Sequence, residues 1–523
     1  MNSELRPVKN FYRREILLNL PPGSNFMYRQ CNNMGFLTEP SCTIYTAGFD
    51  TEYTSDDVIV VGDEVSNTYL LAGAVTAYRS FTFFTLIKKA ANQHKIEVRQ
   101  PDIMEGETPE EVVVLRGNDW KKLLEDYATI VAERNNLPKF GEGKNLTGYC
   151  TWYYYYADVT EKDLLENLDA MAKHRSSCYA ADVVQIDDGY QTFQGDWNDQ
   201  DETWPTPLPE IAKRMTDSGM RAGIWLMPFL ASTASRVFKE HPDWFVKDEN
   251  GNPKVSKGWS PPPDDLWVCL DTTIPAVQEH LKNVFQTFRK WGITYFKMDG
   301  LGFGLMDGKR SDPSATPLSA FRLGMKAIRE AVPDSYLLGC CPPFMACLGY
   351  IDGARISNDT RACRNAIDHV TKTNFARWWM FDKFFRCDPD VVIARQDRST
   401  ASIGDNRLSI MTGIMTGVSI TSDNLNTIAA DRLELLGKSA QIRMRDFRPT
   451  GHWGAGCWPV TFSGTIDGRK AGAVLNTTDE PVTVKFEDMG LDPEQDAEEL
   501  LQDLGKRKYV ITVMPHDAAL LKQ

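Results

Sequence analysis

Two aspartates that each follow a short apolar run are the residues of this chain best suited to catalysis. Residues 295–300 read Tyr-Phe-Lys-Met-Asp-Gly and present Lys297 and Asp299 near the end of a predicted strand. Side chains two positions apart on a strand point to the same face, so we expect the lysine ammonium to keep the nearby carboxylate ionised. An ionised aspartate at the carboxyl end of a strand is a good nucleophile or electrostatic stabiliser.

The second aspartate, Asp359, ends the run Asp-Gly-Ala-Arg-Ile-Ser-Asn-Asp at residues 352–359. Glycoside hydrolysis needs two carboxyl groups on different strand ends, because one attacks or stabilises the sugar while the other protonates the leaving oxygen. The proton donor must carry its proton, so we expect burial or a neighbouring like charge to raise the pKa of Asp359. A mechanism that retains the anomeric configuration would place the two groups about 5–5.5 Å apart.

A further pair of carboxylates, Asp187 and Asp188, follows another apolar run. Adjacent residues of a regular strand point to opposite faces, so we expect the strand to end between these two. Such a pair suits a sugar with several adjacent hydroxyl groups, one of them axial. A solvated turn or a helix cap is the alternative interpretation.

The elements that must position these residues alternate between strands and helices from residue 148 to about residue 423. Eight strands are predicted at residues 147–152, 183–187, 221–227, 295–299, 336–340, 354–357, 391–394 and 418–422. The predicted helices between them include residues 161–174, 208–218, 274–290, 318–331 and 375–385. Eight strand-then-helix units predict a TIM barrel, and the polar motifs stand at the strand ends where such barrels carry their active sites.

The segments on either side of the barrel are rich in strand patterns. Before it, strands are predicted at residues 58–61, 69–71, 80–84 and 112–115, followed by a helix at 120–135 and a linker at 136–145. After it, strands are predicted at residues 471–475, 482–484 and 509–513. We therefore predict a multidomain α/β protein: an N-terminal β-rich domain with its linker (1–140), a catalytic (β/α)8 barrel (141–445) and a C-terminal antiparallel β-sandwich (446–523).

The bulk composition excludes several functional classes. The formal net charge of −13 disfavours binding to nucleic acid or to an anionic membrane. The eleven cysteines are odd in number and scattered, which argues against a disulfide framework. Because the first twenty residues mix charges and contain no apolar signal region, and because no run is long enough to span a membrane, we expect a cytoplasmic protein.

Four motifs follow the predicted strands in a characteristic order. A Trp-Tyr pair (Trp152 and Tyr153) follows the first strand and an Asp-Asp pair the second, while Lys-x-Asp ends the fourth and Arg-x-x-x-Asp the sixth. In order and spacing this arrangement resembles glycoside hydrolase family 36, the retaining α-galactosidases of clan D, and its compact bacterial members above all. The resemblance covers the whole barrel and reaches the flanking regions only in their architecture.

This resemblance implies a retaining, exo-acting α-galactosidase that hydrolyses terminal α-linked galactose by double displacement. It implies that Asp299 is the nucleophile and Asp359 the general acid/base. The carboxylates of Asp187 and Asp188 would accept hydrogen bonds from the O4 and O6 hydroxyl groups of the sugar, and Lys297 would hold O3 and O4.

Further contacts to the sugar are implied by the same resemblance. Arg355 would lie near the nucleophile and O2. Trp152 and Trp225 would form apolar walls, with Cys340 nearby. Within the aromatic run after the first strand, Tyr153 is the one candidate for a substrate contact, because the others fit the core or the barrel rim.

The chain departs from the family pattern in two places. Many members place a tryptophan from the N-terminal domain over the site, but here no tryptophan precedes Trp120, and the corresponding stretch offers only Phe26, Tyr28 and Phe36 as aromatic residues. The loop at residues 340–343, Cys-Cys-Pro-Pro, replaces a Gly/Ser-rich loop that neighbours O2. Two alternatives therefore stay open: an α-N-acetylgalactosaminidase of the same family, and a catalytically silent carbohydrate-binding protein on the same scaffold.

We expect no metal ion and no organic cofactor. The thiols of Cys340, Cys341 and Cys347 invite a metal interpretation, but they form no Cys-x-x-Cys and have no partner histidine at zinc spacing, so buried thiols are the preferred interpretation. The expected partner is a small-molecule oligosaccharide, not nucleic acid or a membrane, and a homo-oligomer is compatible with the sequence.

Overall fold

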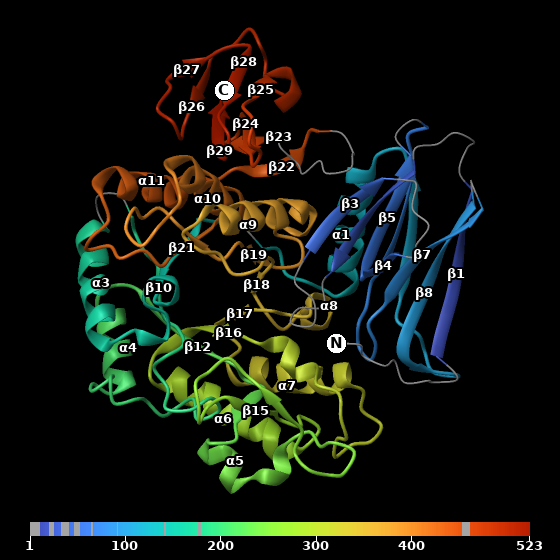
Figure 1. Cartoon of the computed structure of the whole chain (residues 1–523), viewed down its shortest axis with the longest axis vertical. Helices are drawn as coiled ribbons and strands as arrows, with labels where there is room; N and C mark the ends of the chain where they lie inside the picture. Colours follow the sequence, from blue (N-terminus) through green and yellow to red (C-terminus); the bar gives the residue numbers. More distant parts are fainter. Residues whose placement is uncertain are drawn as a thin grey trace.

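The computed structural model describes residues 11–19, 26–32, 41–46, 53–63, 66–90, 93–140, 143–175, 179–451 and 461–523. Three regions are visible in Figure 1: long strands from the N-terminal part, a central α/β region, and a smaller β region from the C-terminal part. The predicted fold class is confirmed, and the exact domain bounds stay a prediction.

The N-terminal part forms two antiparallel sheets, with strand orders β1-β8-β7-β4 and β3-β2-β5-β6-β9. Their bounds are β1 (Phe11–Asn19), β2 (Phe26–Asn32), β3 (Ser41–Thr46), β4 (Tyr53–Asp56), β5 (Val58–Asp63), β6 (Thr68–Ala74), β7 (Phe83–Ala90), β8 (Gln93–Met104) and β9 (Val112–Gly117). Alternate residues of β5 serve two cores. Ile59 and Val61 pack with residues of β7 and β8, whereas Val58 and Val60 belong to the large cluster that includes Tyr127 of helix α1 (Trp120–Arg134). This alternation is the pattern of a strand that is covered on both faces.

The central region is a parallel sheet curled into a TIM-like barrel. Its strands lie in the order β19-β18-β17-β16-β12-β11-β10-β21-β20. Their bounds are β10 (Leu146–Cys150), β11 (Val183–Ile186), β12 (Arg221–Leu226), β16 (Ile293–Met298), β17 (Tyr336–Gly339), β18 (Gly353–Arg355), β19 (Arg386–Asp388), β20 (Val391–Val392) and β21 (Val418–Thr421). The seventh barrel strand is split into β19, which pairs with β18, and β20, which pairs with β21. The split falls at Pro389 and Asp390, where Pro389 lacks an N–H and Asp390 has a left-handed φ of 80°.

Helices surround the barrel. They are α3 (Glu161–His174), α4 (Leu208–Asp217), α6 (Pro275–Lys290), α7 (Pro317–Ala331), α9 (Arg364–Ala376), α10 (Ile403–Thr416) and α11 (Ala430–Gln441), and shorter ones are α2 (Trp152–Tyr155), α5 (Arg236–Glu240) and α8 (Phe344–Cys347). The first four agree with the predicted helices to within one residue at each end. A three-stranded sheet of β13 (Leu230–Ser232), β15 (Leu266–Cys269) and β14 (Val255–Lys257) lies between β12 and α6 in the sequence.

The helix predicted at residues 375–385 is wrong. Helix α9 ends at Ala376, and a 3-10 turn at Trp378–Met380 follows before β19 begins. Phe375, Trp378 and Trp379 are all buried, and their i, i+3, i+4 spacing imitates a helical period. Helix α10 was missed for the related reason that it is buried almost all round and shows little periodicity.

The C-terminal part contains a six-stranded sheet, β22-β23-β24-β29-β26-β27, and the pair β25-β28. The bounds are β22 (Arg445–Pro449), β23 (Thr461–Ile466), β24 (Arg469–Asn476), β25 (Val482–Lys485), β26 (Ala497–Glu499), β27 (Lys506–Arg507), β28 (Val510–Val513) and β29 (Asp517–Lys522). A bidentate ion pair joins it to the barrel: the Arg407 guanidinium of α10 lies 2.8 and 2.6 Å from the two carboxylate oxygens of Asp517. Among the described residues, none of the helices has the length and apolar character that crossing a membrane demands.

Candidate active site

Polar side chains from five barrel strands meet beyond the strands' carboxyl ends. Parallel strands of a barrel bring these ends to one rim. Contacts between strands confirm the convergence: Lys297 of β16 reaches Asp187 after β11, and Arg355 of β18 reaches Cys340 after β17. The indole of Trp225 on β12 reaches Asp299 after β16.

The carboxylate of Asp187 is held by donors on two sides. Strand β11 ends one residue before Asp187, and the backbone N–H of Asp187 donates to Thr151 Oγ1 at 2.9 Å. Its Oδ2 accepts hydrogen bonds from Lys297 Nζ at 2.9 Å and from Gln185 Nε2. The strand therefore ends before both aspartates, not between Asp187 and Asp188 as predicted, because Thr151 takes the N–H that would continue the strand pairing.

Lys297 has Asp187 as its ion-pair partner, not Asp299 as the spacing suggested. Burial lowers the pKa of the Lys297 ammonium, but the negative charge of Asp187 and smaller contributions from neighbours such as Asp299 together outweigh burial and hold that pKa well above its usual value. Lys297 is only 5% exposed, so this site contains a permanently charged, nearly dry ammonium group.

Asp188 differs from its neighbour because no cation among the described residues contacts it. Its Oδ1 accepts hydrogen bonds from Gln191 Nε2 at 2.6 Å and from Gln194 Nε2 at 3.3 Å. Burial raises the pKa of Asp188 to about 6, and the charges of Asp187 and Asp299 act in the same direction against these two donors. Asp188 therefore changes its charge close to neutral pH.

The carboxylate of Asp299 is fixed by two N–H groups. Its Oδ1 accepts a hydrogen bond from the Gly300 N–H at 2.6 Å, and its Oδ2 accepts one from Trp225 Nε1 at 3.1 Å. Gly300 has a left-handed φ of 56°, and a Cβ there would lie 3.0 Å from the sulfur of Met227. Together the two donors fix the orientation of the carboxylate.

Arg355 lies between two aspartates and is only 3% exposed. Its Nη1 lies 3.2 Å from Asp390 Oδ1 and 3.6 Å from Cys340 Sγ. Its Nη2 donates to Asp359 Oδ1 at 3.1 Å. The Asp390 side chain is buried, but that of Asp359 is 60% exposed, so Arg355 joins a buried carboxylate to one that faces solvent.

The expectation of a raised pKa for Asp359 is not met in this ligand-free structure. Partial removal from water raises the pKa of the Asp359 carboxyl, but the positive charges of Arg355 and Lys297 oppose this effect and leave the pKa below its usual value. The arginine four residues before Asp359 is therefore the neighbour that reverses the expected direction.

Two buried aspartates of the seventh strand were missed by the sequence analysis. The Asp390 N–H donates to Asp388 Oδ1 at 2.9 Å, and Asp390 Oδ2 accepts the Thr360 N–H at 2.8 Å. Burial raises the pKa of Asp388 to about 7, and Asp390 adds to this effect while Arg355 opposes it. The Asp-Pro-Asp sequence directly before the strand predicted at residues 391–394 was a signal that could have pointed to these residues.

The predicted aromatic residues occupy different positions. Trp152 is half-buried and packs edge-on against Tyr156, with ring centroids 5.4 Å apart. Tyr153 is buried, at 2% exposure. Trp225 is also buried and packs edge-on against Trp197, with centroids 5.8 Å apart. The side chains of Phe26, Tyr28 and Phe36 lie outside the described residues.

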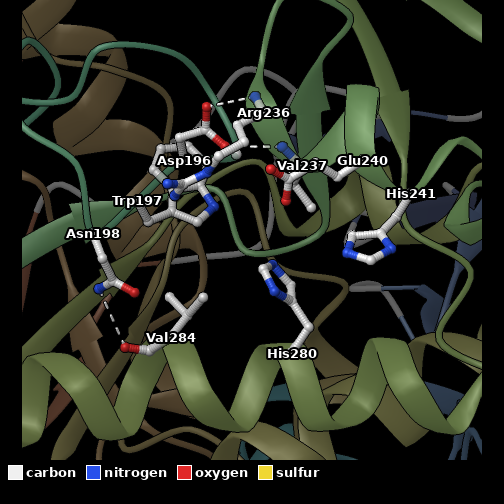
Figure 2. Close-up of a pocket in the computed structure, with 10 residues that line it drawn as sticks. Asp196, Trp197, Asn198, Arg236, Val237, Glu240, His241, His280 and Val284 are labelled. Carbon is white, nitrogen blue, oxygen red and sulfur yellow. Dashed lines mark hydrogen bonds between the residues drawn. The ribbon is translucent and has the colours of Figure 1, made fainter.

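A separate cavity of about 260 Å³ is lined in part by Trp197 (Figure 2). His241 and His280 face each other across it, and the Asp196 carboxylate accepts the N–H groups of Arg236 and Val237. Burial, reinforced by His241, lowers the pKa of His280 to about 4, so that imidazole is neutral at physiological pH.

Comparisons with known proteins agree with this geometry. Residues 106–313 match the Melibiase family model. The chain is 24% identical over 160 residues to the alpha-galactosidase Mel36A of Lactobacillus acidophilus, and the aligned segment covers 29% of this chain and 21% of that protein. It is 31% identical over 128 residues to the A type blood alpha-D-galactosamine galactosaminidase of Flavonifractor plautii, and this aligned segment covers 23% of this chain and 12% of that protein. These matches therefore span only about a fifth or less of the curated relatives' lengths.

The fold is similar to that of solved α-galactosidases. The structure of TtGalA from Thermus thermophilus, in complex with p-nitrophenyl alpha-D-galactopyranoside, superposes with a TM-score of 0.68 at 21% identity, over 90% of this chain and 95% of that one. The fold is therefore of the (β/α)8 type, with paired carboxylates at the carboxyl ends of its strands. The resemblance to glycoside hydrolase family 36 is confirmed by the Melibiase match and by these relatives.

Proposed function

We propose that this protein is a retaining, exo-acting α-galactosidase that removes terminal α-linked galactose from oligosaccharides by double displacement. The observation that carries the proposal is the pair of aspartates after β16 and β18 in unlike surroundings. Asp299 accepts two N–H hydrogen bonds, which suit a group that attacks as an anion. Asp359 is largely exposed beside Arg355, which suits a group that exchanges protons with substrate and water.

In the first step, a carboxylate oxygen of Asp299 forms a bond to the anomeric carbon while the bond from that carbon to the leaving oxygen breaks. Asp359 gives its proton to the leaving oxygen, and the sugar stays attached to Asp299 as a β-galactosyl ester. In the second step, Asp359 takes a proton from water, whose oxygen attacks the anomeric carbon and releases Asp299. Two inversions keep the α configuration.

The charges around the sugar site support recognition of several hydroxyl groups. Asp187, Asp188 and Lys297 are all buried and lie side by side after β11 and on β16. Such groups gain strength as acceptors and donors when the sugar excludes water. Asp187 and Asp188 are proposed to bind O4 and O6, and Lys297 O3 and O4.

Asp359 must be protonated in the first step, so its lowered pKa predicts how kcat/KM depends on pH. The ratio kcat/KM reports the free enzyme and should fall as the pH rises through the pKa of Asp359. We propose that sugar binding removes water from Asp359 and raises its pKa, so the descending limb of kcat should lie at higher pH than that of kcat/KM. Coincident limbs would contradict this proposal.

A second candidate activity is the hydrolysis of an α-linked 2-amino sugar. The Cys-Cys-Pro-Pro loop at residues 340–343 is the observation that favours it, together with the galactosaminidase among the relatives. An α-N-acetylgalactosaminidase would use the same two aspartates and differ only beside C2. A silent carbohydrate-binding protein is less well supported, because binding alone needs no second carboxylate.

The test is hydrolysis of p-nitrophenyl α-galactoside, with NMR of the first sugar released and the α-N-acetylgalactosaminide in parallel. Release of α-galactose first supports both substrate and mechanism, whereas β-galactose first overturns retention. Cleavage of the acetamido analogue alone overturns the assignment of galactose as the substrate sugar. Binding of galactose without turnover of either glycoside overturns the proposal that the protein is an enzyme. The described cysteines are all free thiols, which supports the further proposal of a cytoplasmic location.

A further inference from the structure

Two neighbouring thiols lie beside the carboxylate of Asp299. One carboxylate oxygen of Asp299 and the sulfur atoms of Cys340 and Cys341 all lie within 4.8 Å of one another. Cys340 is buried, at 2% exposure, while Cys341 and Asp299 are partly exposed. The sequence analysis rejected a metal interpretation of these thiols because no Cys-x-x-Cys or zinc-spaced histidine accompanies them, but the third group comes from a different strand.

The backbone explains why two adjacent thiols face the same way. Adjacent residues of a strand point to opposite faces. Here β17 ends at Gly339, and Cys341 takes a left-handed φ of 48°, which is uncommon for a residue with a side chain. The carbonyl of Cys341 accepts the Gly302 N–H at 3.2 Å, and the Cys340 N–H donates to the Met298 carbonyl at 2.8 Å. These bonds fix the turn against the segment that carries Asp299.

We propose that Cys340, Cys341 and Asp299 form a binding site for a thiophilic divalent cation such as Zn²⁺ or Cd²⁺, and that an ion bound there blocks the reaction by occupying Asp299. Two thiolates and a carboxylate are ligand types that zinc takes in proteins, and soft thiolates select such ions over Mg²⁺ or Ca²⁺. Only the inhibition rests on the proposed function. The binding itself does not.

Distances and charges are compatible with this site. Ligand atoms around tetrahedral zinc, at about 2.0–2.3 Å from the metal, lie roughly 3.3–3.8 Å apart, so a contraction of about 1 Å suffices. Two thiolates, one carboxylate and a dication leave one net negative charge. The Arg355 guanidinium, 3.6 Å from Cys340 Sγ, lies where it can balance that charge.

Binding must release protons from the thiols. Each S–H gives its proton to solvent as its sulfur bonds to the cation. Because binding displaces these protons, the apparent affinity should increase with pH. The partly exposed Cys341 and Asp299 indicate that the ion would enter from the side on which the sugar is proposed to bind.

The test begins with Cd²⁺ titration of the reduced full-length protein, followed by the ultraviolet thiolate-to-cadmium absorption band. We expect Cys341→Ala to bind one equivalent of Cd²⁺ at least about tenfold more weakly than the wild type, so that this equivalent is no longer bound tightly. Cys340→Ala should show a similar loss. The matched control is Cys363→Ser, which alters a partly exposed thiol outside this group and should leave the band unchanged. Equal Cd²⁺ binding by wild type and Cys341→Ala would overturn the site.

A second measurement tests the inhibition. Zn²⁺ should inhibit hydrolysis of p-nitrophenyl α-galactoside competitively, EDTA should reverse it, and Cys341→Ala should need at least about tenfold more Zn²⁺ relative to its own uninhibited rate. Non-competitive inhibition, or equal inhibition of wild type and variant, would overturn the proposal that the bound ion blocks Asp299. If no hydrolysis occurs at all, the proposed function fails, and the absorption titration still decides the cation site.

Discussion

The carboxylates after β16 and after β18 are both aspartates, but their surroundings differ in almost every respect. Asp299 is partly buried and receives hydrogen bonds from a backbone N–H and an indole N–H, both neutral donors. Asp359 is 60% exposed and contacts a guanidinium. Neutral fixed donors hold a carboxylate in place, whereas an exposed group beside a charge can exchange protons with water. The contrast supports the two different roles proposed for these aspartates.

The two regions also differ in how their charges are balanced. On the β16 side, the buried Lys297 is paired with Asp187 while Asp188 has only amide donors. On the β18 side, one buried arginine serves Asp390 and Asp359. Removal of a charge should therefore have different consequences on the two sides, and four substitutions test this from the largest effect to the smallest.

The substitution D299N should remove the proposed nucleophile. An amide cannot form the galactosyl ester, so kcat on p-nitrophenyl α-galactoside should fall at least roughly a thousandfold. The matched control is D158N, an exposed aspartate in the turn after α2, which should keep its activity. Retention of more than a tenth of wild-type activity by a folded D299N protein would refute the assignment.

The substitution K297M should lower the free energy of unfolding of the protein. It leaves the buried carboxylate of Asp187 without its cation, which typically costs about 3–5 kcal/mol. Urea unfolding followed by circular dichroism measures this change in the free energy of unfolding. The double variant K297M/D187N should recover part of the loss, because the charge left unpaired is gone. No recovery would mean that Lys297 acts through its packing and not through the ion pair.

The substitution D390N tests the β18 side. Without the negative charge of Asp390, Arg355 acts more strongly on Asp359, so the pKa of Asp359 should fall further and the descending limb of kcat/KM should move to lower pH. We expect kcat/KM at neutral pH to fall roughly ten- to a hundredfold, part of what a general acid contributes.

The control for this substitution is D388N. The pKa of Asp388 is raised to about 7, so at mildly acidic pH the protonated acid resembles asparagine, and the change should be less than about threefold. If D390N lowered the rate but left the pH limb in place, Asp390 would be a structural residue and not a positioning residue for Arg355.

The substitution D188N should have the smallest and most pH-dependent effect. Asp188, with a pKa of about 6, is mostly protonated at low pH and mostly ionised above neutrality. Only the ionised form offers a charge-assisted hydrogen bond to a hydroxyl group. The ratio of wild-type to D188N kcat/KM should therefore rise by roughly three- to tenfold between about pH 5 and about pH 7.5. A constant ratio would show that Asp188 keeps one protonation state throughout.

Much of the barrel could be predicted because its signals are local. The strand that carries Lys297 and the helix α3 follow from short runs of apolar spacing, and the structure gives α3 the predicted bounds. The segment at residues 375–385 could not be placed in this way, since the buried Trp378 and Trp379 continue the helical spacing of Phe375 although helix α9 ends at Ala376.

The sequence by itself determined the order of the strands, the fold class and the set of acidic and basic residues at the strand ends. Only the tertiary structure decided which charges meet: that Lys297 pairs with Asp187, that Arg355 lowers the pKa of Asp359 and contacts Asp390, and that two thiols turn toward Asp299. The physical reason is that spacing along the chain fixes the face and end of a strand on which a side chain stands. Electrostatic partners, in contrast, come from neighbouring strands tens or hundreds of residues away, and closure of the barrel alone brings them within reach.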